Sequence, residues 1–185
     1  VSGARVAAPR SLTIDIGIPT EIVAASAGLA ETDIATQSYT PLIASVGAAF
    51  VIAEVASVEA LSRAAPDIGA FRAAAERFPE LAHRCSLYLY AWADPGERRL
   101  RARMFAPLSG TWEDPATGSA AAALAGLLTS LAPGDTVDLQ YAIEQGVEMG
   151  RPSLIVASGL KAAEGPVSAS IAGTCVPAMR GTLQV

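Results

Sequence analysis

The residues with the clearest chemical potential lie between Glu113 and Ala120, in the sequence EDPATGSA. Asp114 offers a carboxylate that can accept or return a proton. Pro115 fixes the backbone beside it, and Gly118 permits backbone conformations that let a bound molecule approach the main chain. This stretch is therefore the first candidate for a small-molecule site.

A segment of small apolar residues, from Gly118 to Leu131, follows this stretch. It includes four consecutive alanines, Ala120 to Ala123, and no charged residue occurs between Asp114 and Asp135. A helix that is apolar on all sides is buried on all sides. We therefore predict a central helix over residues 118–131, with β-structure wrapped around it.

The start of a buried helix leaves the backbone N–H groups of its first turn without intrahelical acceptors. Leaving them unpaired costs roughly 1–3 kcal/mol each. The side chain of Thr117 or Ser119 can cap them, as at many ordinary helix starts. A carboxylate ligand can accept the same bonds, and the helix dipole favours its negative charge. The residues alone leave both alternatives open; under the second, the ligand-binding residues are Thr117, Gly118, Ser119 and Ala120.

The two cysteines are expected to be structural. Cys85 and Cys175 lie in strand-like runs, without a helix start or a neighbouring base that would lower the pKa of a thiol. We expect two buried free thiols in a reducing cytoplasm. No cluster of histidine, cysteine and aspartate has the spacing of metal ligands, so no metal site is predicted.

Several polar and aromatic residues near the candidate stretch have a structural interpretation. An internal ion pair is the expected role of Glu148 and Arg151, and Glu113 is expected to point away from Asp114. Trp112 and Phe105 suit a pocket wall and core packing equally well. The single histidine, His83, is expected at the surface or at a strand edge.

The remaining sequence predicts the elements that position these residues. Helices are expected at 20–27, with Thr20 as N-cap and Gly28 as stop, and after the capping residues Ser57 and Asp67. Strands are expected at 12–16, 35–40, 47–56, 84–92, 100–105, 137–143, 153–157, 167–171 and 182–185, and an irregular loop at 106–117. Short early helices and strands throughout indicate an α+β domain.

Composition excludes several classes of function. The chain has 185 residues, of which 51% are hydrophobic and 17% charged, and its net charge is −5. This acidic chain has few aromatic residues and no basic cluster, so nucleic-acid binding is not expected. No apolar run reaches the roughly 18 residues of a membrane span, and no stretch reads as a signal peptide. We expect a cytoplasmic protein without a membrane partner.

Three blocks of the sequence carry a family resemblance. Arg103 to Pro107 (RMFAP), with Gly110, precedes EDPATGSA; Gln145 to Ser153 reads QGVEMGRPS; and Gly173 to Leu183 follows near the end. In this combination and spacing the blocks resemble the PhzF-like family, which takes its name from phenazine biosynthesis. The resemblance covers most of the chain and is clearest from Ser86 to Val185.

The resemblance implies a diaminopimelate-epimerase-like fold, in which two similar lobes each wrap a curved sheet around a central helix. It implies a cofactor-independent isomerase that moves a proton on a small cyclic or amino-acid-like carboxylate bound between the lobes. By its match to the family signature, Asp114 belongs to the catalytic site. The matching amides of Gly118, Ser119 and Ala120 bind the substrate carboxylate.

The sequence departs from the family at the N-terminal lobe. The family's main acid/base, a glutamate, and a glycine–histidine pair of that lobe have no counterpart here. Residues 1–185 are therefore expected to form the C-terminal lobe, with residues 1–20 as a remnant of the inter-lobe connection. Three alternatives stay open: a fragment, a subunit of a split enzyme, and a non-catalytic binding half. The expected assembly is a homodimer or a complex with a chain that carries the N-terminal lobe and its glutamate.

Overall fold

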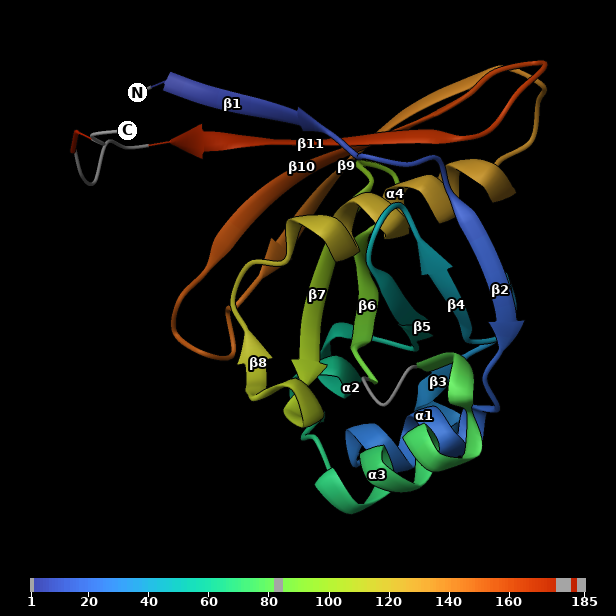
Figure 1. Ribbon diagram of the computed structural model, residues 1–185, viewed down its shortest axis with the longest axis vertical. Helices are drawn as coiled ribbons and strands as arrows, with labels where there is room; N and C mark the ends of the chain where they lie inside the picture. The colour runs from blue at the N-terminus through green and yellow to red at the C-terminus, as the bar shows by residue number, and fades with distance from the viewer. Residues whose placement is uncertain (1, 82–84, 176–180, 183–185) are drawn as a thin grey trace.

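One long helix lies within a curved sheet (Figure 1), in a computed structural model that describes residues 2–81, 85–175 and 181–182. The helices are α1 Thr20–Ala27, α2 Val58–Arg63, α3 Ile68–Arg77 and α4 Gly118–Leu131, with the short 3-10 helices η1 Glu31–Asp33, η2 Pro79–Leu81 and η3 Pro107–Ser109. The strands are β1 Ser2–Ala7, β2 Thr13–Gly17, β3 Ile34–Ala35, β4 Leu42–Ser45, β5 Ala49–Val55, β6 Leu87–Asp94, β7 Arg99–Ala106, β8 Thr111–Asp114, β9 Val137–Gln145, β10 Ser153–Lys161 and β11 Ser168–Cys175.

All these strands belong to one mixed sheet. Its order is β1-β11-β10-β9-β7-β6-β5-β4-β2, with β3 added beside β5 and β8 beside β7. The pairs β5–β6 and β7–β9 are parallel, and the other pairs are antiparallel. The sheet curls around α4, while α1, α2 and α3 lie outside it (Figure 1). The predicted α+β class, with a mixed sheet around a central helix at 118–131, is confirmed.

The inner core surrounds α4. Every residue of this helix from Ala120 to Thr129 is buried, as its uniformly small and apolar sequence requires. Strands β6 and β7 turn Tyr88, Tyr90 and Leu100 toward it. Strand β10 approaches so closely that a Cβ at Gly159 would lie 2.7 Å from the Ala125 carbonyl oxygen. None of the helices in the described ranges is long and apolar enough to cross a membrane.

The outer core lies on the opposite face of the same strands. Side chains alternate along a strand, so Leu87 and Leu89 of β6 and Phe105 of β7 pack against α1, α2 and α3. Phe71 of α3 is completely buried in this layer. The central strands are therefore covered on both faces, which explains why the sequences of β5 and β6 are largely apolar.

The predicted helix boundaries agree closely with the structure at three positions. Ser57 Oγ accepts from Ala60 N–H at 3.1 Å, and Asp67 Oδ1 accepts from Ala70 N–H at 2.9 Å. Gly28 ends α1 with a φ of 62°, a left-handed conformation that favours glycine. The predicted cap Thr20 is wrong, because Thr20 lies within α1 and its hydroxyl donates to Glu31.

Other boundary predictions fail where pairing between distant segments decides the structure. The strand predicted at 35–40 is wrong: only Ile34–Ala35 is extended there, and the main strand is β4. The loop predicted at 106–117 contains η3 and β8, which pairs with β7. Strand β1 carries no clear alternation in the sequence and forms by pairing with β11. The strand predicted at 182–185 lies mostly outside the described residues.

Candidate functional site

The candidate site consists of Asp114, Thr117, Gly118, Ser119 and Ala120, which the chain brings together where β8 leads into α4. Strand β8 pairs with β7, with Asp114 opposite Met104. Helix α4 then begins at Gly118, as the sequence predicts, with Thr117 in the N-cap position. The five residues predicted from the sequence are therefore neighbours along one short segment.

The first turn of α4 is not capped by a side chain. Thr117 makes no capping hydrogen bond; its hydroxyl donates instead to Asp114 Oδ2 at 2.7 Å. The Ala121 N–H bonds to the Thr117 carbonyl oxygen at 3.0 Å. For the N–H groups of Gly118, Ser119 and Ala120, no acceptor lies within hydrogen-bonding geometry among the described residues. Three donors at the positive end of a helix dipole are thus available to an acceptor.

The side chain of Gln145, at the end of β9, holds the segment before the helix. It is completely buried. Its Nε2 donates to the Asp114 carbonyl oxygen at 2.6 Å and to Thr117 Oγ1 at 3.0 Å. Its Oε1 accepts from the Thr117 N–H at 3.2 Å and from the Tyr88 hydroxyl at 3.3 Å. Sequence reasoning placed Gln145 in a family block and gave it no structural or functional role.

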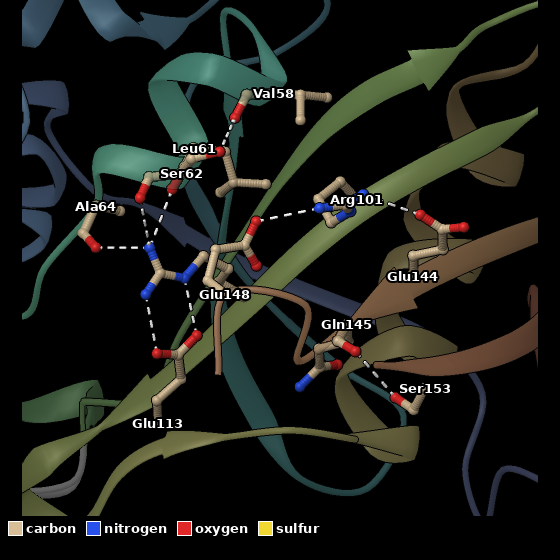
Figure 2. A network of polar contacts seen from close by, with 11 residues as sticks. Val58, Leu61, Ser62, Ala64, Arg101, Glu113, Glu144, Gln145, Glu148 and Ser153 are labelled. Carbon is tan, nitrogen blue, oxygen red and sulfur yellow. Dashed lines mark hydrogen bonds and ion pairs between the residues drawn. The ribbon is translucent and has the colours of Figure 1, made fainter. Parts of the chain in front are cut away.

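The turn that follows β9 presses against the same segment. Gly146 has a φ of 78°, and a Cβ there would lie 2.8 Å from the Pro115 carbonyl oxygen. Ser153 Oγ donates to the same Pro115 oxygen at 2.8 Å and also lies 3.2 Å from the Gln145 carbonyl oxygen, a contact drawn in Figure 2. The two sequence blocks, EDPATGSA and QGVEMGRPS, are therefore parts of one packed unit.

Glu113 points away from Asp114, as predicted, and forms a buried ion pair. Arg103 Nε and Nη2 donate to the two carboxylate oxygens of Glu113 at 2.8 and 2.9 Å. Arg103 Nη1 also donates to three carbonyl oxygens at the end of α2, those of Leu61, Ser62 and Ala64 (Figure 2). This ion pair ties β8 to β7 and α2, so it fixes the start of the segment that carries Asp114.

Glu148 is also structural, but its partner differs from the expected one. Arg101 Nη1 lies 3.2 Å from Glu148 Oε1, and Arg101 Nη2 lies 3.1 Å from Glu144 Oε2 (Figure 2). No ion pair of Arg151 with Glu148 occurs in the described part of the chain. Glu148 thus forms an internal ion pair, but the expected role of Arg151 is wrong: Arg101 supplies the cation, and Arg151 is exposed.

An open groove adjoins the start of α4. One hollow of about 320 Å³ extends from Gly118 along β10 and β11 and includes Leu154 and Ile171. A second hollow of about 160 Å³ includes Ser119 and Pro9 and shares Gly118 and Ile171 with the first. The groove, meaning these two hollows together, has mostly small and apolar walls. It can hold an apolar molecular body whose acidic group reaches the free N–H groups.

The environment of Tyr88 supports its role as a hydrogen-bond donor to Gln145. Burial, with a further contribution from the negative charge of Asp114, raises the pKa of the Tyr88 phenol well above its usual range. The phenol therefore stays protonated at neutral pH. A protonated Tyr88 can donate to Gln145 Oε1, which leaves the amide nitrogen of Gln145 to donate toward the loop.

The remaining candidates are the two cysteines, two aromatic residues and the single histidine, and of these Cys175 lines the first hollow of the groove. Cys85 is a buried free thiol, as predicted, and burial raises its pKa to about 12, which keeps it unreactive. Cys175 is free but exposed, so the prediction that it is buried is wrong; it ends β11, where no core layer covers it. Phe105 is completely buried in the outer core, whereas Trp112 is 57% exposed. His83 lies outside the described residues.

A family model matches almost the entire chain. The model, PhzC-PhzF, described as phenazine biosynthesis-like protein, matches residues 7–181. This match includes both blocks that form the packed unit at the start of α4.

Curated relatives match about three quarters of the chain. The chain is 39% identical over 137 residues to an uncharacterized isomerase of Mesorhizobium japonicum, covering 73% of this chain and 45% of the relative. It is 37% identical over 139 residues to the trans-2,3-dihydro-3-hydroxyanthranilate isomerase of Pseudomonas fluorescens, covering 74% and 45%. The isomerase of the same name from Pseudomonas aeruginosa is 40% identical over 129 residues, covering 69% and 41%. The chain thus spans less than half the length of these relatives.

Solved structures share the fold. The PhzF-family phenazine biosynthesis protein of Bacillus anthracis superposes with a TM-score of 0.78 at 22% identity, covering 93% of this chain and 57% of that protein. The PhzF-family protein of Enterococcus faecalis gives a TM-score of 0.53 at 19% identity, with 93% and 53% coverage. At these identities the likeness concerns the fold alone.

Proposed function

Since the chain belongs to the PhzC-PhzF family of phenazine biosynthesis-like proteins, we propose that it forms one lobe of an isomerase that moves a proton on a small cyclic carboxylate. Four relatives bear the name isomerase, and three of them are named for trans-2,3-dihydro-3-hydroxyanthranilate, a cyclic carboxylate. The proposal extends to the diaminopimelate-epimerase-like arrangement, in which this curved sheet around α4 is one of two lobes and the substrate lies between them.

The substrate carboxylate binds at the start of α4. The observation that carries this step is the set of three N–H groups, of Gly118, Ser119 and Ala120, that have no acceptor among the described residues. Gly118 lines both hollows of the groove and Ser119 lines the second, and the apolar walls suit the ring of the substrate. Hydrogen bonds from N–H groups to a charged acceptor are stronger than those to a neutral one. The helix dipole adds to them.

Asp114 acts as an acid/base group beside the bound carboxylate. The Thr117 hydroxyl donates to Asp114 Oδ2. This bond fixes the orientation of the Asp114 side chain. The more distant Oδ1, 3.5 Å from the Ala116 N–H, is held weakly and can exchange a proton. A second acid/base group must face the other side of the substrate, and we propose that a glutamate of the other lobe supplies it. The residues that take part in this scheme need no metal or organic cofactor.

A titration with benzoate tests the carboxylate site directly. Benzoate combines a ring with a carboxylate, and two-dimensional NMR of the ¹⁵N-labelled protein follows each amide. We expect the signals of Gly118, Ser119 and Ala120 to shift in a saturable way, while amides at the far end of α4, such as that of Thr129, stay constant. Benzamide, which lacks the charge, serves as the matched probe. If the three amides respond to neither benzoate nor inorganic phosphate, the proposed site is wrong.

A further inference from the structure

We propose that Gln145 is a positioning residue that keeps the start of α4 open by holding the Thr117 hydroxyl away from the first-turn N–H groups. This inference rests on the proposed carboxylate site. The groups it involves are the Gln145 amide, the Thr117 hydroxyl and the N–H donors of Ser119 and Ala120. Gln145 itself makes no contact with the groove and acts through Thr117.

The Gln145 amide has only one orientation in its pocket. Both its nitrogen and its oxygen are occupied twice: the nitrogen donates to the Asp114 carbonyl and Thr117 Oγ1, and the oxygen accepts from the Thr117 N–H and the Tyr88 hydroxyl. Rotating the amide by 180° would set its oxygen against the Asp114 carbonyl oxygen, 2.6 Å away in the present arrangement. The side chain is completely buried, so water cannot replace a lost partner. The amide nitrogen must therefore face Thr117.

Thr117 occupies a position at which threonine ordinarily caps a helix. At an N-cap the hydroxyl oxygen accepts from the N–H two or three residues further on, here Ser119 or Ala120. In this structure the hydroxyl accepts from Gln145 Nε2 and donates to Asp114 Oδ2. The backbone of Thr117, with φ −109° and ψ 87°, does not have the usual conformation of an N-cap residue. These two bonds fix the direction of the hydroxyl, and its remaining lone pair makes no hydrogen bond to the first turn of the helix.

The loss of the Gln145 amide should therefore allow a competing cap. Without Nε2 as its donor, Thr117 Oγ1 is free to accept from the Ala120 N–H. A carboxylate ligand must then displace this cap before it can bind. Breaking one N-cap hydrogen bond before the ligand binds should make its affinity about fivefold weaker. The same bond should slow hydrogen exchange of the Ala120 amide, whether or not a ligand is present.

Four variants test this inference against a simple loss of structure. Gln145→Met preserves the length of the side chain and removes the amide; Gln140→Met, on an exposed position of the same strand, is the matched control. Thr117→Val removes the hydroxyl, and the double variant Gln145→Met/Thr117→Val removes both. Benzoate affinity and amide hydrogen exchange at Ser119 and Ala120 are measured by NMR for each protein.

We expect Gln145→Met to bind benzoate about fivefold more weakly and to exchange the Ala120 amide more slowly. Gln140→Met should bind about as well as the parent protein, whereas Thr117→Val alters the site itself and serves as the reference for the double variant. The double variant should regain affinity, because no hydroxyl remains to cap the helix. A double variant as weak as Gln145→Met, or an unchanged Gln145→Met, would show that Gln145 has no such role.

The readouts separate this inference from the proposed function. If benzoate fails to bind the parent protein, the carboxylate site is wrong, while the exchange rates still report on the cap. If Gln145→Met does not fold, the parent protein decides the question by itself. Its Gln145 side-chain amide should be protected from exchange, while the Ser119 and Ala120 N–H groups exchange faster than that of Ala121. A protected Ala120 amide in the parent protein would overturn the inference.

Discussion

Helix α4 is closed by the protein at its carboxyl end and left open at its amino end. At the carboxyl end, Lys161 Nζ donates to the carbonyl oxygens of Ser130 and Ala132 at 3.3 and 2.9 Å. At the amino end, the N–H groups of Gly118, Ser119 and Ala120 have no acceptor in the described ranges. Both ends belong to the same helix, which is buried from Ala120 to Thr129 and emerges from the core at each end.

Both ends of α4 are held by side-chain hydrogen bonds, but only those at the carboxyl end satisfy backbone groups of the helix. A positive side chain at the carboxyl end matches the negative end of the dipole and satisfies its carbonyl groups. At the amino end, Gln145 and Thr117 form a fixed hydrogen-bonded unit that satisfies its own members. That unit leaves the helix donors untouched. The end that only stabilises the fold is closed, whereas the end that adjoins the groove keeps donors that the proposed carboxylate site would use.

The largest expected effect comes from breaking the ion pair that anchors the open end. Arg103→Met removes the cation and leaves Glu113, whose side chain is 11% exposed, as a buried unpaired charge. We expect a loss of about 3–5 kcal/mol in the free energy of unfolding, measured by urea denaturation.

Arg99→Met on the same strand is the matched control for this change. Arg99 is 54% exposed and pairs with Glu144 at 3.5 Å, so solvent screening should keep its effect within about 0.5 kcal/mol. Equal losses in the two variants would contradict an anchoring role for the Arg103–Glu113 pair.

The second-largest effect is expected when a methyl group is added at Gly118, the first residue of α4; Gly126 of the same helix provides the comparison. A Cβ at Gly118 would lie 2.5 Å from Ile171 Cδ1, and Ile171 would have to move within the groove. We expect Gly118→Ala to weaken benzoate binding about tenfold, or about 1.4 kcal/mol, as measured by NMR titration.

Gly126→Ala should act in the opposite direction. A Cβ at Gly126 meets only ordinary contacts, the nearest being Leu12 Cδ1 at 3.5 Å. Alanine is favoured over glycine inside a helix, so we expect the free energy of unfolding to rise by about 0.5–1 kcal/mol without a change in benzoate binding. If both variants bind benzoate like the parent protein, the groove at Gly118 is not the binding surface.

The smallest effect is expected at the closed end. Lys161→Met keeps most of the apolar stem and removes the two hydrogen bonds to the last turn of α4. We expect a loss of about 1 kcal/mol in the free energy of unfolding, with benzoate affinity unchanged. A change in benzoate affinity would mean that the two ends of α4 do not act independently.

The sequence predicts the features that depend on local pattern. The bounds of α4 follow from its small apolar residues, and the caps Ser57 and Asp67 follow from residue type and position. The segment EDPATGSA is recognisable because its candidate site residues are nearly contiguous. These predictions need no knowledge of distant contacts, because the physical cause lies within one or two turns of chain.

Features that depend on residues far apart in the sequence cannot be predicted from the local sequence pattern. Gln145 contacts Thr117 across 28 positions of sequence, and no periodicity links the two. Residue type even favours the wrong conclusion for Thr117, because a threonine before a glycine–serine helix start resembles an ordinary cap. The hydroxyl instead accepts from a buried amide of another strand and donates to Asp114. Strands β8 and β1 likewise form by pairing with β7 and β11 rather than by their own alternation.

The pairing of β1 with β11 also sets an order of events during synthesis. Ser2 lies opposite Cys175 and Ala7 opposite Ser170, so β1 leaves the ribosome long before its partner exists. Loop closure over such a separation is slow, and contacts of this kind reduce folding rates. We expect β2–β7, whose neighbours follow within a shorter stretch of chain, to assemble first. The wall of the groove that β1 and β11 provide would then be completed last, after the helix start that it borders.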